Sequence, residues 1–166
     1  MLKAIVHVDK NWGIGKGNDM MFSLPLDMKF FRSTTLHHIV VMGGNTLRSF
    51  PNGQPLKNRV NIVLSRGQVR DDCIIVRSYE ELKSELKTRK NEEIFVIGGG
   101  EVYKELLPYC DEALVTKVDA VGGAEVFFPN LDEDENFVCV DEGEEIEDNG
   151  HTIRFTIYKN NHVEEL

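Results

Sequence analysis

Residues 94–103 read IFVIGGGEVY, and this stretch establishes the class of fold. Ile94 to Ile97 form a continuous apolar run, which is typical of a strand buried on both faces of a sheet. Three glycines follow, and the residues from Glu101 to Leu107 favour a helix. A buried strand that turns through glycine into a helix indicates one unit of a parallel α/β sheet.

Two further apolar runs also end in polar or glycine-rich turns, and the first of them leads into a helix. IVVMGGNT, residues 39–46, predicts a strand over His38–Met42 and a short helix over Thr46–Phe50, and NIVLSR, residues 61–66, predicts a strand over Val60–Leu64. The other predicted elements are strands over Ala4–Val8, Ile74–Val76, Leu114–Val118 and Thr152–Tyr158, helices over Pro25–Thr34 and Tyr79–Thr88, and loops over Asn11–Met21 and Pro51–Lys57.

Strands and helices alternate until about Phe127, and the late segments lack helices between them. We therefore expect an α/β fold with a mostly parallel central sheet, flanking helices and antiparallel C-terminal edge strands. The length of 166 residues suits a single domain that spans residues 1–166.

Composition excludes several kinds of partner. Lys and Arg number 19 and Asp and Glu 28, which gives a formal net charge of −9. That charge argues against binding to nucleic acid or to an anionic membrane. The N-terminus is charged too early for a signal peptide, and the cysteines Cys73, Cys110 and Cys139 are too far apart for a zinc motif. We expect a cytoplasmic protein without a metal.

Three predicted strands end in polar or glycine-rich turns, and ligands of open α/β sheets bind at the carboxyl ends of strands. Glycine turns that lead into helices offer N–H groups to phosphate, so the two glycine turns with Ser65 and Arg66 indicate a dinucleotide with an extra phosphate. The dinucleotide fingerprint itself is absent, because Tyr103 stands at the third glycine position. Any single glycine turn of this kind is more often plain turn chemistry.

The stretch MMFSLPLDMKFF, residues 20–31, contains an unusual acid. Leu24, Asp27, Met28 and Phe31 are spaced so that they share one helical face, and three of them are apolar and favour burial. An acid near a helix N-terminus is favoured by the helix dipole, but a solvent-facing position would serve equally well. Asp27 is therefore either a carboxylate that faces a ligand in an apolar pocket or a core acid with a hidden partner.

Together, seven segments in this order resemble the dihydrofolate reductase family over nearly the whole chain. They are IVHVDKNWGIG, SLPLDMKFFRSTT, VVMGGNTLRSF, PLKNRVNIVLSR, IFVIGGGEVY, VTKVDA and FFP. The resemblance implies a monomer that reduces dihydrofolate to tetrahydrofolate with NADPH, feeds one-carbon metabolism and binds antifolate inhibitors.

The resemblance also implies roles for residues on the substrate side. Asp27 matches the acid that holds the pterin ring through a two-point hydrogen bond, and Thr116 matches the threonine that hydrogen-bonds this acid. Phe22 joins them in the catalytic set. Arg59 matches the arginine that binds the carboxylate of the glutamate tail. The other residues implied for substrate binding are Ile5, Val6, Met28, Phe31, Phe50, Leu56 and Ile97.

On the cofactor side, two glycine turns match the pyrophosphate cradles, and Ser65 and Arg66 match the site of the 2′-phosphate. Ile14, Gly15 and Met20 lie in the family's mobile loop beside the nicotinamide. The full set implied for NADPH binding is His7, Ile14, Gly15, Met20, Gly43, Gly44, Asn45, Thr46, Leu64, Ser65, Arg66, Arg77, Gly98, Gly99, Gly100, Glu101, Val102 and Tyr103.

The sequence departs from the family pattern at four places. Met21-Phe22 stands for Pro-Trp, His7 for alanine, Gly44 for arginine, and Ala124-Glu125-Val126 for Gly-Asp-Thr in a loop that hydrogen-bonds the mobile loop. His7 is either a core histidine or a titratable side chain near the nicotinamide. The sequence leaves two other functions open: a reductase of the same fold acting on a pyrimidine of riboflavin synthesis, and a nucleotide-binding module without catalysis.

Overall fold

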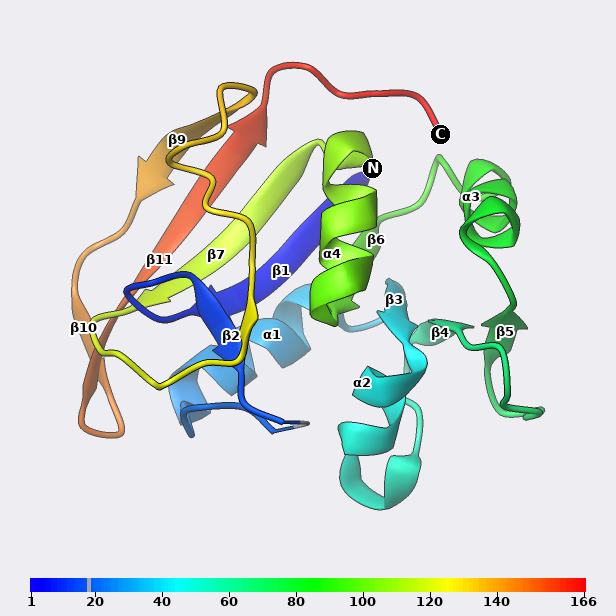
Figure 1. Ribbon diagram of the computed structural model, residues 1–166, viewed down its shortest axis with the longest axis horizontal. Helices are drawn as coiled ribbons and strands as arrows, with labels where there is room; N and C mark the ends of the chain where they lie inside the picture. The colour runs from blue at the N-terminus through cyan, green and yellow to red at the C-terminus, as the bar shows by residue number, and fades with distance from the viewer. Residues whose placement is uncertain (18) are drawn as a thin grey trace.

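The computed structural model describes residues 1–17 and 19–166 (Figure 1). Its strands are β1 (Leu2–Val8), β2 (Gly13–Gly15), β3 (Ile39–Gly43), β4 (Val60–Leu64), β5 (Ile74–Val76), β6 (Ile94–Gly98), β7 (Glu112–Val118), β8 (Val126–Phe127), β9 (Phe137–Glu142), β10 (Ile146–Asp148) and β11 (His151–Asn160). Its helices are α1 (Pro25–Thr35), α2 (Gly44–Ser49), α3 (Tyr79–Lys87) and α4 (Gly100–Leu106), with short 3₁₀ turns η1 (Pro51–Gly53) and η2 (Leu107–Tyr109).

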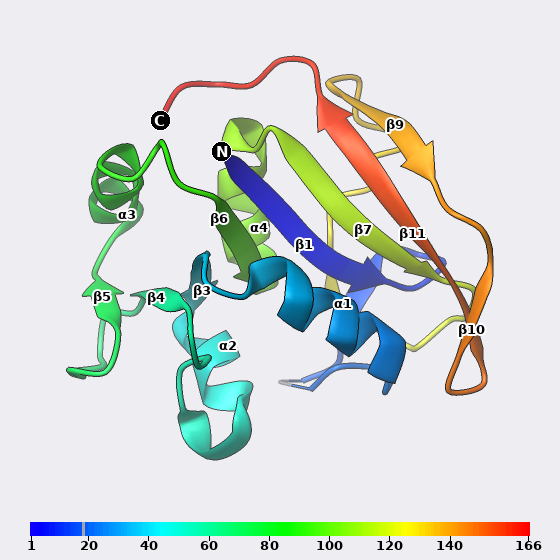
Figure 2. The same ribbon diagram turned by 180° about the vertical axis from the view of Figure 1, so that it is seen from behind.

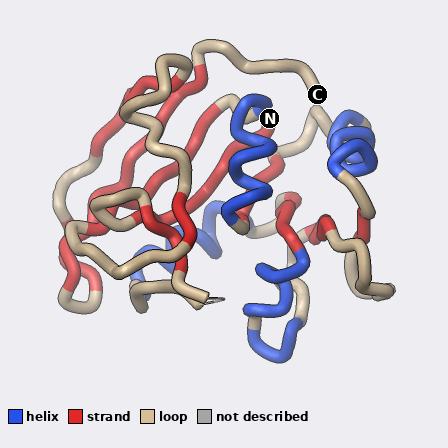
Figure 3. Tube along the Cα trace, in the orientation of Figure 1, coloured by secondary structure: helices blue, strands red, loops and turns tan. Residues whose placement is uncertain are grey.

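The described residues form one large sheet of nine strands, in the order β10-β11-β7-β1-β6-β3-β4-β5, with β9 also paired to β11. The strands from β7 to β5 in this order are parallel, whereas β11 runs antiparallel to β7, and β9 and β10 run antiparallel to β11. Figure 3 shows these late strands along one side of the sheet. The predicted α/β sheet with antiparallel C-terminal strands is confirmed.

Helices cover both faces of the sheet. In Figure 1, α4 lies in front of β1 and β6, and in the reverse view of Figure 2, α1 lies on the near side of the sheet, below β1. Because β1, β3, β4, β6 and β7 are mutually parallel, their carboxyl ends meet at one edge of the sheet. The residues predicted for ligand binding at strand ends therefore lie along that edge.

The core consists of two main clusters because side chains alternate between the faces of each strand. Ile39 and Val41 of β3 pack in one cluster with Leu82 and Leu106 from α3 and α4. Val40 and Met42 of β3 pack in the other, together with Leu47 of α2 and half-buried side chains of α1. All four residues of this strand are at most 2% exposed, which is the pattern of a strand covered on both faces.

The predicted elements differ from the structure in several details. The predicted loop Asn11–Met21 contains the short strand β2, which pairs with β8, and its residue 18 lies outside the described residues. Helix α2 begins at Gly44 instead of Thr46, because the extended Gly43 is already its N-cap. Helix α4 ends at Leu106, and Leu107 begins η2. Strand β7 begins two residues early, at Glu112.

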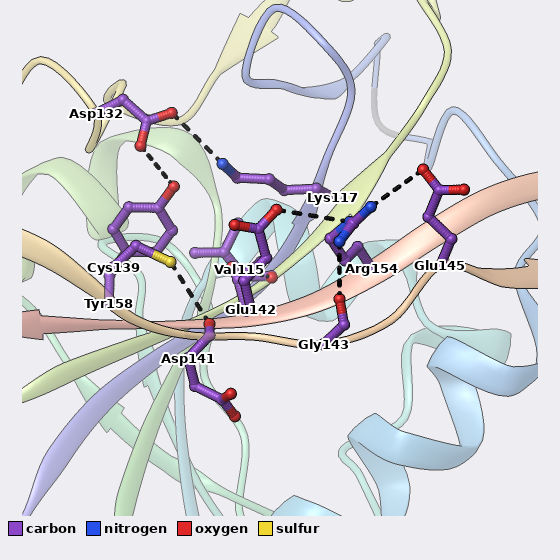
Figure 4. Close-up of polar contacts among 11 residues, drawn as sticks. Val115, Lys117, Asp132, Cys139, Asp141, Glu142, Gly143, Glu145, Arg154 and Tyr158 are labelled. Atoms are coloured by element: carbon purple, nitrogen blue, oxygen red, sulfur yellow. Dashed lines mark hydrogen bonds and ion pairs between the residues drawn. The ribbon is translucent and has the colours of Figure 1, made fainter.

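The antiparallel edge is held by polar contacts that join β7, β9 and β11 (Figure 4). Tyr158 donates to Asp132 at 2.7 Å, and Lys117 lies 3.4 Å from the other oxygen of that carboxylate. Burial and the neighbouring Asp132 raise the pKa of the Tyr158 phenol. Arg154 pairs with Glu142 and Glu145 at 3.6 and 3.1 Å. Exposed ion pairs of this kind each contribute about 0–1 kcal/mol, so Tyr158, which is 1% exposed, is the stronger anchor.

Asp9, just after β1, joins two loops at the edge that carries the strand ends. Its Oδ1 accepts the N–H of Asn11 and Gly13, and its Oδ2 accepts the N–H of Gly122, all within 3.0 Å. Burial by itself raises the pKa of Asp9, but these three backbone donors lower it further than burial raises it. The carboxylate thus fixes residues 9–13 against the loop that precedes β8.

We expect Asp9→Asn to destabilise the fold by about 1–3 kcal/mol at pH 7. The asparagine side chain has only one, neutral oxygen, so it cannot accept all three N–H groups that the two carboxylate oxygens accept. Because the pKa of Asp9 is lower in the folded than in the unfolded protein, its contribution to stability is complete above the unfolded pKa of about 3.9. The contribution is lost as the pH falls through the lower pKa of the folded protein. Urea unfolding of the parent and the variant at pH 7 and pH 3 measures the difference in their free energies of unfolding. A difference of the same size at both pH values would contradict the prediction.

Candidate active site

The start of α1 is held by a residue distant in the sequence. Its N-cap residue, Leu24, has no side chain that can accept a hydrogen bond. The carboxylate of Asp148, at the end of β10, instead accepts the N–H of Leu26 and of Asp27, each at 3.1 Å. Asp148 is 2% exposed, so this tertiary cap is shielded from water. The hairpin of β10 and β11 therefore fixes where Asp27 lies.

Asp27 is itself 7% exposed and lies in the first turn of α1. Thr116 donates its hydroxyl to Oδ1 at 2.7 Å, which confirms the predicted hydrogen bond between these residues. The Nδ1 atom of His7 lies 3.2 Å from Oδ2. A carboxylate has about four lone-pair positions, and these contacts use two of them. Two positions remain for a ligand with paired N–H donors.

The rest of the predicted stripe on α1 differs from the expectation of burial. Leu24 is 1% exposed, but it precedes the helix, and Met28 is 38% exposed. Phe31 is half-buried and packs at the margin of the cluster that contains Ile5. The helical part of the stripe is therefore not a core contact, because Met28 is exposed and Phe31 is only half-buried.

Five of the predicted substrate residues belong to one apolar cluster although they are distant in the sequence. The cluster contains buried Ile5 and half-buried side chains from α1, the segment after α2 and β6, namely Phe31, Phe50, Leu56 and Ile97. Val6 points the other way and packs at the margin of the opposite cluster. The apolar wall that the resemblance implied is therefore assembled, with Val6 contributing no side chain to it.

Arg59 lies beside this wall with its guanidinium held in place. Its Nε donates to Thr35 at 2.8 Å, its Nη1 to the Lys57 carbonyl at 2.8 Å, and its Nη2 to the Arg32 carbonyl at 3.3 Å. Partial burial and the positive charge of Arg32 lower the pKa of Arg59. No carboxylate within the described residues pairs with it. An oriented arginine without an acidic partner suits an anionic ligand group.

A polar recess of about 500 Å³ lies between the ends of β3 and β4. It is lined by Gly44, Asn45, Arg48, Leu64, Ser65, Arg66, Gly67 and Gln68. A Cβ atom added at Gly44 would lie 3.3 Å from both the Arg48 guanidinium and the Ser65 hydroxyl. The side-chain oxygen of Gln68 is buried without a partner among the described residues. An acceptor oxygen offers no hydrogen bond to a phosphate, but the two arginines make this recess suitable for one.

The second glycine turn lies at the end of β6. Gly98 has a φ of +128°, a backbone conformation that glycine adopts without strain. Gly99 and Gly100 lead into α4, and buried Tyr103 of that helix donates to the Ile5 carbonyl at 2.7 Å. Burial and the charge of Asp27 raise the pKa of Tyr103. The turn that was expected to bind pyrophosphate is thus tied to β1 near Asp27.

The predicted mobile loop is joined to the segment before β8 despite the departures there. The Gly17 N–H donates to the Glu125 carboxylate, and the Glu125 N–H donates to the Gly15 carbonyl, each at 2.9 Å. Ile14 is half-buried within β2, whereas Met20 is 57% exposed. Glu125 thus connects the two loops. Phe22 is buried, and the centroids of its ring and the His151 ring lie 4.9 Å apart.

A family model described as dihydrofolate reductase matches residues 1–161. The chain belongs to the dihydrofolate reductase family. It is 33% identical over 162 residues to the dihydrofolate reductase of Bacillus subtilis, covering 96% of this chain and 94% of that protein. It is 37% identical over 155 residues to that of Haemophilus influenzae, covering 92% and 94%. Membership makes the chain an oxidoreductase, and dihydrofolate reductases use NADPH.

Some residues around this site were missed by sequence reasoning. Arg48 lines the polar recess and lies one helical turn after Gly44, so its spacing to Gly44 was a signal in the sequence. Glu125 was considered only as a departure from the family pattern. Asp148 gave no local signal, because its contacts depend on how distant segments pack.

We expect Asp148→Ala to lower the free energy of unfolding by about 1–3 kcal/mol, because two buried N–H groups lose a charged acceptor. Hydride transfer should also slow, since the first turn of α1 carries Asp27. Glu147→Ala is the matched control, since Glu147 is exposed in the same strand. Urea unfolding and single-turnover kinetics measure both effects. Equal behaviour of the two variants would show that the cap does not support the site.

Proposed function

We propose that Asp27 binds the pterin ring of dihydrofolate while NADPH reduces it to tetrahydrofolate. The observation that carries this proposal is the carboxylate of Asp27, which is 7% exposed, ordered by Thr116 and His7, and left with two acceptor positions. A pterin presents two adjacent N–H donors on its amidine-like edge. Two parallel hydrogen bonds to one carboxylate would bind and orient the ring.

The charge of this carboxylate is what assists the reaction. A negative charge in an apolar setting interacts strongly with a nearby positive charge, because little water screens it. It therefore favours a proton on the ring nitrogen next to the carbon that accepts hydride. Thr116 holds the carboxylate in place, and Asp148 holds the turn of helix that carries it.

The apolar wall and Arg59 suit the rest of the substrate. Phe31, Phe50 and Leu56 would enclose the benzoyl group, and Arg59 would bind the carboxylate of the glutamate tail. Exposed Met28 lies on the same side of α1 and would close over the ligand. Antifolates with the same amidine edge would occupy this site.

The cofactor fits the two glycine turns and the polar recess. Gly43 to Thr46 and Gly98 to Tyr103 would hold the pyrophosphate, and Ser65, Arg66 and Arg48 the 2′-phosphate, with Leu64 beside the adenine. Arg77 donates to the Ser65 carbonyl at 2.8 Å and would support that segment. Bound NADPH supplies the hydride, and the chain supplies orientation and charge.

The decisive assay follows NADPH absorbance after dihydrofolate is added. We expect turnover with dihydrofolate and none with the ribityl pyrimidine of riboflavin synthesis, because Arg59, oriented by Thr35, would bind a carboxylate tail that only dihydrofolate has. Turnover of the pyrimidine alone would favour the other reductase function. Binding of NADPH without turnover of either substrate would favour a nucleotide-binding module.

The setting of this activity is also part of the proposal. We propose that residues 1–166 act as a single domain and a monomer in the cytoplasm, without nucleic-acid or membrane partners. The net charge of −9 and the three unpaired cysteines support this. Among the described residues, no helix is long and apolar enough to cross a membrane, and no cluster of side chains could hold a metal ion.

We expect Arg66→Ala and Arg48→Ala each to weaken NADPH binding by about 1.5–3 kcal/mol, the usual loss for a hydrogen bond to a charged group. NADH binding should change little, because NADH lacks the 2′-phosphate. Arg89→Ala is the control, since Arg89 pairs with Glu85 and Glu92 beyond α3. Fluorescence titration with both cofactors measures this. Equal losses for NADPH and NADH would place the 2′-phosphate elsewhere.

A further inference from the structure

One residue of the site, His7, has a ring nitrogen that the proposed chemistry leaves without a role. Its side chain is 9% exposed, and Nδ1 lies 3.2 Å from Oδ2 of Asp27. An ionised carboxylate only accepts hydrogen bonds, so the hydrogen in this contact is on Nδ1. The other ring nitrogen, Nε2, is buried and has no partner among the described residues.

The sheet register explains why His7 reaches the carboxylate. His7 of β1 and Thr116 of β7 are paired in register on neighbouring parallel strands, so their side chains emerge side by side on the same face. Thr116 donates to Oδ1 and His7 to Oδ2 of the same carboxylate. The two strands therefore hold the acid by both of its oxygens.

The other polar groups around His7 are engaged elsewhere. The Phe22 ring, with a centroid distance of 6.3 Å, offers no hydrogen-bond donor. His151 of β11 lies on the Phe22 ring, Tyr103 of α4 donates to the neighbouring Ile5 carbonyl, and Asp148 of β10 accepts from the α1 backbone. Among the described residues, only the side chains of Asp27 and Thr116 form one hydrogen-bonded group with that of His7.

We propose that His7 is a positioning residue for Asp27: its Nδ1–H group donates to Oδ2 and, together with Thr116 on Oδ1, fixes the orientation of the carboxylate toward the pterin. This inference rests on the proposed role of Asp27. Without His7, the carboxylate is held at one oxygen only and can turn away from the two N–H groups of the ring.

The hydrogen-bonding geometry of this pair is tested without any substrate. Nitrogen-15 NMR of the free protein, at a pH where the His7 ring is neutral, reports which nitrogen carries the hydrogen, and His7→Asn assigns the signal. We expect the hydrogen on Nδ1. A hydrogen on Nε2 would overturn the proposal, and this result does not depend on whether the protein reduces dihydrofolate.

The functional part is tested by single-turnover hydride transfer from pH 5 to 9 in the parent, His7→Asn and His7→Ala. The asparagine amide can replace the Nδ1 donor, whereas alanine cannot. Above neutral pH, we expect Ala to be about tenfold slower than the parent and Asn to recover most of that loss.

Two results would overturn the functional part. One is an equal loss in Asn and Ala, which would mean that His7 only fills space. The other is a parent-like rate in Ala. His162→Asn is the control for replacing a histidine, since His162 is exposed near the C-terminus. A parent without any turnover of dihydrofolate would refute the proposed function, while the NMR result would still decide the contact of His7.

Discussion

The hydrogen bond of 2.7 Å from Thr116 to Asp27 is the contact on which the site depends. A carboxylate inside a protein stays ionised only when donors replace the water that it has lost. Here the donors come from β7 and β1, while the helix that carries the acid begins against Asp148 of β10. The sheet order β10-β11-β7-β1 brings these elements next to one another. The strand pairing that forms the antiparallel side of the sheet therefore also brings the residues of the site together.

Buried or bridging carboxylates recur around this site, each as an acceptor of backbone N–H groups. Asp9 ties residues 9–13 to Gly122, Asp148 caps α1, and Glu125 joins Gly17 to the segment before β8. Where the contact is shielded from water, as at Asp9 and Asp148, a hydrogen bond to a charged group contributes about 1.5–3 kcal/mol, more than a bond between neutral groups. The exposed contact of Glu125 contributes less. Such acceptors hold loops in place without large apolar contacts. Several acidic residues of the chain thus stabilise the structure near the edge of the sheet where the carboxyl ends of the parallel strands meet.

The sequence predicted the sheet well because continuous apolar runs and glycine turns are local signals, as in residues 39–46 and 94–103. It also predicted Asp27 and Thr116, through the resemblance of their segments to the family. It was wrong about the burial of Met28, since periodicity marks a face but does not say whether protein or ligand covers it. Asp148 and the contact of His7 were missed, because both depend on which distant strands lie side by side. Arg48 could have been found from its spacing to Gly44.

The central claim is that the negative charge of Asp27 assists hydride transfer, and replacement of this residue by asparagine removes only that charge. Asn keeps the size of the side chain and can still accept from Thr116, so the fold should persist. We expect single-turnover hydride transfer at pH 7 to fall by roughly 10²–10⁴, the range for lost acid–base assistance. The deficit should shrink as the pH falls, since acid protonates the substrate directly, and NADPH affinity should change little. A rate near that of the parent at neutral pH would contradict the account.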